Sequence, residues 1–145
     1  MGRTKGERRR ARELAFRLLY EMEVTGDPPP VVLRAEDAEQ EIAPGVREYA
    51  ALLLELVTTH SDTIDGAITR HAHNWSLGRL AATDRAVLRL AVAELLHQPE
   101  VPAEVVIDEA IEIARRFGNP NSGGFVNGVL DAIWHEAEPP AAGEA

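Results

Sequence analysis

The stretch RRRARELAFRLLYEM, residues 8–22, indicates what kind of fold this chain forms. Its apolar residues recur at intervals of three and four, which places them on one side of an α-helix. They are Ala11, Leu14, Ala15, Leu18, Leu19 and Met22. Thr4 and Glu7 have the spacing of a capping box, and Gly26 before three prolines is typical of a helix end. We therefore expect an amphipathic helix between these two signals, with its apolar side against a core.

The rest of the chain shows the same periodicity, and no alternating run is long enough to predict a β-strand. Prolines and glycines delimit the further helices, which are 31–41, 46–75, 83–97, 102–118 and 122–137, with a short segment at 77–80. Because 46–75 contains no proline, we expect one long helix there, bent near 61–66. Thr83 or Asp84 is expected to cap the next helix. The fold class is all-α, with six or seven helices in an N-terminal three-helix group packed on a C-terminal group.

Length and composition limit the possible functions. The chain has 145 residues, enough for one domain over residues 1–137, followed by a tail at 138–145 that we expect to be disordered. It has no cysteine, which excludes disulfides, thiolate nucleophiles and Cys-ligated zinc. No signal peptide and no uncharged apolar run of membrane-spanning length are visible. These features predict a cytoplasmic protein that does not associate with membranes.

Neither a metal site nor an active site emerges from the motifs. His71 and His73 would point about 200° apart on a helix, since each residue turns the chain by about 100°. His60 and His71 share a side, but that side is apolar and offers no third ligand. There is no glycine-rich phosphate loop after a strand and no serine in a nucleophile elbow. The sequence therefore predicts no metal, no cofactor and no enzymatic activity.

The positive charge of the chain is concentrated at its start. Residues 1–17 hold seven of the 15 basic residues and two of the 24 acidic ones, so this segment carries +5 and the remainder −14. Basic charge in the first turns of a helix opposes the helix dipole. An anionic partner would compensate, and Arg8, Arg9 and Arg12 are therefore candidate contacts to nucleic acid. The alternative is a helix start that only increases solubility.

A second basic group comprises Arg79, Arg85 and Arg89. Arg85 and Arg89 are four residues apart on a predicted helix, so both guanidinium groups point to the same side and could bind adjacent phosphates. Ion pairs with Asp84, Glu94 or residues of neighbouring helices are an equally acceptable explanation.

The segment NPNSGGFVNGVLD, residues 119–131, combines glycines, polar residues and an aromatic ring at a predicted helix start. Glycines allow close approach of a ligand or another backbone, and helix N-termini bind phosphate well. Asn121 and Ser122 lie beside Phe125, whose ring would stack on an unpaired base if exposed. Alternatively, Phe125 is a hydrophobic staple buried in the core.

Four segments together resemble one known family. They are RRRARELAFRLLY (8–20), TDRAVLRLAVAEL (83–95), VPAEVVIDEAIEIARRFG (101–118) and FVNGVLD (125–131). Their order and content are similar to the NusB family of bacterial transcription antitermination factors. Two departures are visible: Ala93 stands where many members have an aromatic residue, and Asn121 with the following glycine pair replaces charged residues.

The resemblance implies an all-helical protein that pairs with NusE, a small-subunit ribosomal protein. Such a pair binds the single-stranded boxA element of ribosomal RNA leaders and helps the RNA polymerase antitermination complex to read through terminators. The family pattern assigns phosphate contacts to Arg8, Arg9, Arg12 and Arg89, base contacts to Tyr20 and Phe125, and NusE binding to Asp84, whose other role is that of a helix cap. Arg85, Asn121 and Ser122 complete the candidate RNA-binding set.

Two other functions remain open at this point. The same helical domain occurs in front of a ribosomal RNA cytosine methyltransferase, and the chain could be a stand-alone relative of that RNA-binding domain. The sequence given ends at residue 145 without room for a cofactor-binding sheet, which favours the separate factor. A helical protein–protein module without RNA binding is the other alternative.

Overall fold

The computed structural model describes residues 5–73 and 75–137, and these form helices and their connections without any strand. The helices are α1 (Lys5–Thr25), α2 (Pro29–Glu39), α3 (Pro44–Thr59), α4 (Ser61–His71), the 3₁₀ helix η1 (Leu77–Arg79), α5 (Ala82–His97), α6 (Ala103–Phe117) and α7 (Ser122–Ala137). The all-α prediction is confirmed. Thr4 of the predicted capping box and the 138–145 tail lie outside the described residues.

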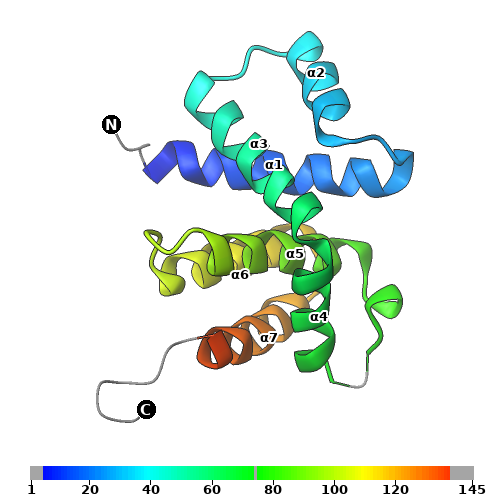
Figure 1. Ribbon diagram of the computed structural model, residues 1–145, viewed down its shortest axis with the longest axis vertical. Helices are drawn as coiled ribbons and strands as arrows, with labels where there is room; N and C mark the ends of the chain where they lie inside the picture. The colour runs from blue at the N-terminus through cyan, green and yellow to red at the C-terminus, as the bar shows by residue number, and fades with distance from the viewer. Residues whose placement is uncertain (1–4, 74, 138–145) are drawn as a thin grey trace.

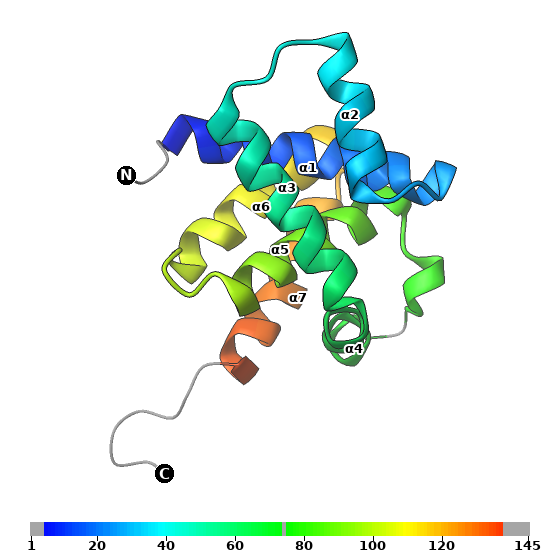
Figure 2. The ribbon, with the colours of Figure 1, turned by 45° about the horizontal axis from the view of Figure 1, so that its top comes forward.

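The helices form the two expected groups, with α5 between them. α1, α2 and α3 contact one another, while α5 contacts α1, α3, α4, α6 and α7. Figures 1 and 2 show α2 at one end of the molecule and α7 toward the other, with α5 in the middle. Leu88, Val92 and Ala93 of α5 are fully buried. A central helix with apolar residues around most of its circumference is what this packing requires.

Prolines and a glycine set the ends of the N-terminal helices. Pro29 and Pro44 occupy the first positions of α2 and α3, where a missing backbone N–H costs no intrahelical hydrogen bond. Gly26 follows α1 with φ of 79°, a left-handed conformation that glycine adopts without strain. The predicted boundaries of these helices are therefore close to those observed.

The prediction of one long helix over 46–75 is wrong. His60, with φ of −110° and ψ of 26°, separates α3 from α4, and α4 ends at His71. The Thr58 hydroxyl donates to the Leu54 carbonyl at 2.9 Å, a contact that bends helices. Trp75 therefore lies outside the helix and is 52% exposed. Apolar residues continue at helical spacing on both sides of the break, so periodicity alone does not reveal it.

The predicted cap of α5 is also wrong. The helix begins at Ala82, and its N-cap is Ala81, which makes no side-chain cap hydrogen bond. Leu80 and Ala81 have ψ of 147° and 140°, so the extended backbone ends before Thr83. Asp84 consequently lies inside the first turn, where the helix dipole still stabilises a negative charge.

Two histidines meet at the α3–α4 break and give the fold a dependence on pH. The rings of His60 and His97 stack with centroids 3.9 Å apart. His97 Nε2 is buried, and no described residue offers it a hydrogen bond. Burial, and secondly the neighbouring His60, lower the pKa of His97, so the folded protein favours its neutral form.

We therefore expect acid to destabilise the protein through His97. Below its ordinary pKa of about 6.5, the unfolded chain takes up a proton that the folded chain resists. The stabilising contribution is complete above about pH 6.5 and is lost as the pH falls from there to the lowered pKa. Urea unfolding at pH 7.5 and 5.5 measures this loss, and His97→Gln should reduce it. An unchanged pH dependence in the variant would contradict this assignment.

Candidate nucleic-acid interface

One arginine of α1 lies in the protein interior. Arg12 is 6% exposed and donates Nε–H to Glu94 Oε1 at 2.8 Å and Nη2–H to Glu94 Oε2 at 2.7 Å. The Tyr49 hydroxyl donates to the same Oε2 at 2.6 Å. Burial, and then the Glu94 carboxylate, raise the pKa of Tyr49, so its hydroxyl remains a protonated donor. This network joins α1, α3 and α5.

The burial of Arg12 does not agree with the expected phosphate contact. Its guanidinium is held by Glu94 and also lies 3.8 Å from Glu109 Oε1, so it presents no surface to a nucleic acid. The sequence contains a signal for this position. Arg12 precedes Ala15 by three residues and Leu19 by seven, which places it within the apolar stripe of α1. We assign Arg12 to the core and not to the interface.

Arg8 and Arg9 are less buried than Arg12, although Nε of Arg8 is itself buried and has no hydrogen-bond partner among the described residues. Arg8 is half-buried and lies over the Tyr49 ring, with Cζ 5.0 Å from the ring centroid. The Arg9 side chain is 55% exposed, and its Nε is 3.2 Å from both carboxylate oxygens of Glu109. No described contact uses the Nη groups of Arg9. An arginine fixed at Nε with free Nη groups is well prepared to bind phosphate.

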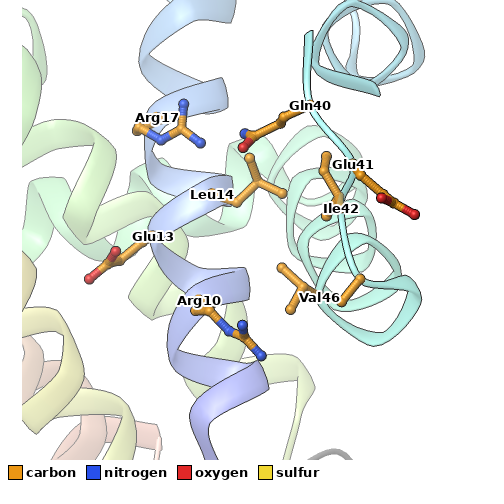
Figure 3. A pocket seen from close by; sticks show the side chains of 9 residues that line it. Arg10, Glu13, Leu14, Arg17, Gln40, Glu41, Ile42 and Val46 are labelled. Carbon is orange, nitrogen blue, oxygen red and sulfur yellow. The ribbon is translucent and has the colours of Figure 1, made fainter. Parts of the chain in front are cut away.

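A groove of about 280 Å³ lies on another side of α1. Figure 3 shows Arg10, Leu14 and Arg17 pointing toward residues 40–43 and Val46, while Glu13 points to the opposite side of the helix. Arg17 pairs with Glu36 of α2 at 3.4 Å. Arg10 is exposed and has no ion pair among the described residues. The groove mixes charges of both signs over an apolar floor and therefore favours no particular ligand.

Arg85 and Arg89 form ion pairs with neighbouring helices, the second of the two alternatives. Arg85 pairs with Glu23 of α1 and donates to the carbonyl oxygens of Leu77 and Leu80 at 3.1 and 2.9 Å. Arg89 Nε lies 2.9 Å from Asp65 Oδ1 of α4. These contacts hold α5 to α1 and α4, which leaves neither guanidinium free for phosphate.

The α7 start, the segment before α5 and the first turn of α5 line an open surface cavity of about 480 Å³. It is lined by Trp75, Arg79, Leu80, Ala81, Asp84, Asn119, Asn121 and Phe125. Phe125 is half-buried: its ring packs against the core and also lines the cavity, so it is neither a fully buried staple nor a fully exposed ring. Asp84 is 7% exposed, and a basic side chain of a partner would have to enter the cavity to reach it. Sequence reasoning did not connect these segments.

Ser122 and Gly123 fit closely against neighbouring residues at the start of α7. Ser122 is 1% exposed, and its Oγ accepts the Asn119 backbone N–H at 3.0 Å. A Cβ at Gly123 would lie 3.1 Å from Cγ of Arg115, so this glycine admits a side chain of α6. The Ser122 hydroxyl is thus engaged inside the protein, whereas Asn121 is exposed at the cavity.

One side of α1 carries Arg9 near its start and Glu23 near its end. Arg9, Glu13, Tyr20 and Glu23 recur at intervals that keep them on one side of the helix, over about 21 Å at 1.5 Å per residue. Glu13 pairs with Arg116, and Glu23 pairs with Arg85 beside the cavity. Tyr20 is 42% exposed between these two ion pairs. We call this surface the α1 strip; its acids are neutralised, so it does not repel an anion.

The described residues offer no group of three or more His, Asp or Glu side chains that could hold a metal ion. His71 instead pairs with Glu136, connecting α4 to α7. None of the helices described combines the length and apolar character that crossing a bilayer requires.

Comparison with known proteins gives one consistent family. The model of the NusB family matches residues 9–135. The transcription antitermination protein NusB of Myxococcus xanthus is 40% identical over 132 residues, covering 88% of this chain and 94% of the relative. That of Geobacter sulfurreducens is 41% identical over 129 residues, covering 88% and 94%.

Solved structures agree with the sequence relatives. The structure of T. maritima NusB is similar with a TM-score of 0.82 and 38% identity, covering 96% of both chains. A second structure contains antitermination factors NusB and NusE in complex with double-stranded RNA. Its similar chain gives a TM-score of 0.81 and 30% identity, covering 92% of this chain and 99% of that one.

Proposed function

The chain belongs to the NusB family, and from this we propose that it promotes transcription antitermination by binding single-stranded boxA RNA of ribosomal RNA leaders together with NusE. In this proposal, the complex acts on RNA polymerase during transcription. The α1 strip is the observation that carries the proposal, because it combines the exposed guanidinium of Arg9 with the exposed ring of Tyr20 on one side of the helix. A related solved structure holds NusB, NusE and RNA in one complex, which supports both partners.

The proposed RNA contacts are Arg8 and Arg9 for phosphate and Tyr20, Asn121 and Phe125 for bases. Ring faces such as those of Tyr20 and Phe125 stack on bases that are not already paired, which favours single-stranded RNA. NusE, as a ribosomal protein, would suit the −14 charge of the chain beyond residue 17. The related complex of NusB, NusE and double-stranded RNA favours RNA binding over a protein–protein module without it.

The Arg9→Ala substitution is expected to weaken the binding of boxA RNA and of a scrambled single strand by the same factor. The Nη groups of Arg9 would contact phosphate, which is the same in every sequence. The slope of log K against the logarithm of the salt concentration should become less steep by about 0.7, the value for one phosphate contact to a single strand. Fluorescence anisotropy titrations at several salt concentrations measure both effects.

Arg34→Ala is the matched control, because Arg34 is exposed on α2 at the far end of the molecule and has no ion pair among the described residues. Its salt dependence should equal that of the unmodified protein. An Arg9→Ala variant that melts normally and keeps the full salt dependence would exclude Arg9 from the interface.

A further inference from the structure

Glu109 of α6 is a buried carboxylate that faces an exposed arginine of α1. It is 6% exposed, and both of its carboxylate oxygens lie 3.2 Å from Nε of Arg9. Arg12 comes no closer than 3.8 Å to Glu109 Oε1, and its own hydrogen bonds go to Glu94. The hydrogen bonds described for Glu109 therefore all come from Arg9.

This contact fixes one edge of the Arg9 guanidinium and leaves another edge open. Nε–H donates to Glu109, whereas no described contact uses the two Nη groups. The Nη groups together form an edge that can donate in parallel to two oxygens of a phosphate. A long side chain that is already ordered loses less freedom on binding than a mobile one. The pair thus prepares Arg9 for an anion without occupying the edge that the anion needs.

The charge of Glu109 alone would have the opposite effect on RNA binding, because an acid beside a phosphate contact repels the strand. Two further acids of α6, Asp108 and Glu112, line a surface hollow of about 240 Å³ together with Arg9 and Glu109. Both are exposed, and neither forms an ion pair among the described residues. Glu109 differs from them because it is buried and holds Arg9. Position and charge therefore predict changes of opposite sign when Glu109 is replaced.

We propose that Glu109 is a positioning residue for RNA binding, which accepts Nε–H of Arg9 and so holds the Nη edge toward the phosphate backbone. This inference rests on the proposed function, in which Arg9 contacts phosphate, and it gives α6 a part in a contact made by α1. The Glu109 side chain is only 8% exposed and does not itself touch RNA in this account. Its effect on RNA passes through Arg9.

Two variants of Glu109 separate position from charge. Glu109→Gln and Glu109→Met remove the same negative charge and keep a side chain of similar length, but only glutamine retains an oxygen that accepts Nε–H. The glutamine variant should bind boxA RNA and a scrambled single strand at least as tightly as the unmodified chain. The methionine variant should bind both strands about threefold more weakly than the glutamine variant, because a mobile arginine must be ordered on binding. Fluorescence anisotropy with the full chain measures these affinities.

Arg9→Ala connects this effect to its cause. In that background, Glu109→Gln and Glu109→Met should bind RNA equally, because the side chain that they position differently is absent. Glu112→Gln and Glu112→Met form the matched control pair, since Glu112 lines the same hollow without an ion pair among the described residues. These two variants should also bind RNA equally. Thermal melting checks that every variant folds.

Should Glu109→Met not fold, NMR of the unmodified protein tests the contact. The Nε–H of Arg9, assigned with Arg9→Lys, should exchange with water more slowly than the Nε–H of Arg34. Arg34 is the reference because it is exposed and has no ion pair among the described residues. Exchange of Arg9 as fast as that of Arg34 would overturn the inference.

The remaining outcomes distinguish this inference from the proposed function. Equal RNA affinities of Glu109→Gln and Glu109→Met, with weaker binding by Arg9→Ala, would overturn the inference and leave the proposed function intact. Tighter binding by the methionine variant would show that Glu109 competes with RNA for Arg9, which also contradicts the inference. The same holds if the two variants still differ in the Arg9→Ala background. Unchanged RNA binding by Arg9→Ala itself would remove the phosphate contact from the proposed function, and this inference with it.

Discussion

Replacing Glu94 by alanine is expected to lower the free energy of unfolding by about 3–5 kcal/mol, the usual loss when one partner of a buried ion pair is removed. The variant leaves the guanidinium of Arg12 buried without its bidentate partner, and it removes the acceptor of the Tyr49 hydroxyl. Both groups then lack compensation in the centre of the molecule, where α1, α3 and α5 meet. Urea unfolding followed by circular dichroism measures the change.

Glu112→Ala is the control, because Glu112 is an exposed acid on α6 and its removal should alter the unfolding free energy by less than about 0.5 kcal/mol. Arg12→Ala should be as destabilising as Glu94→Ala. Below its melting temperature, this variant should bind RNA with the same salt dependence as the unmodified protein. A stable Arg12→Ala variant with a reduced salt dependence would return Arg12 to the interface.

Phe125→Ala is expected to have two separable effects. One part of the ring contacts the core, so the unfolding free energy should fall, but by less than the 3–5 kcal/mol typical of a fully buried phenylalanine. Another part lines the cavity, and loss of stacking should cost about 1–3 kcal/mol of RNA binding without changing the salt dependence. Thermal melting and RNA titration of the same sample measure the two effects.

Phe117→Ala provides the comparison, since this ring is 40% exposed at the end of α6, packs on Phe16 and does not line the cavity. It should lower stability and leave the RNA affinity unchanged below the melting temperature. If Phe125→Ala melts like a buried-core variant and still binds RNA normally, stacking by Phe125 is refuted.

The fold could be predicted because apolar spacing and prolines act locally. The stripe of α1 and the prolines before α2 and α3 depend on neighbouring residues only, and these predictions are confirmed. The break at His60 could not be found in this way. Val57 before it and Ile64 after it are both buried, so the apolar spacing continues across a residue that is not helical.

The site was less accessible to sequence reasoning, because burial and ion pairing are long-range. The pattern around Arg8, Arg9 and Arg12 shows charge but not which side chain is enclosed; Glu94, 82 residues away, decides that for Arg12. The cavity likewise unites Trp75, Asp84 and Phe125 from three segments that only the packing of α5 and α7 brings together. The sequence left open whether Phe125 is exposed or buried, and in the structure its ring is half-buried, while Asn121 is exposed.

The cooperation of RNA and NusE on this chain is the central claim. The direct test is a titration of the chain with single-stranded boxA RNA, with and without saturating NusE, and the reciprocal titration with NusE. Each ligand should tighten the binding of the other by the same factor, about fivefold or more, because coupling between two sites is reciprocal. The same RNA affinity in the presence and absence of NusE would contradict this account.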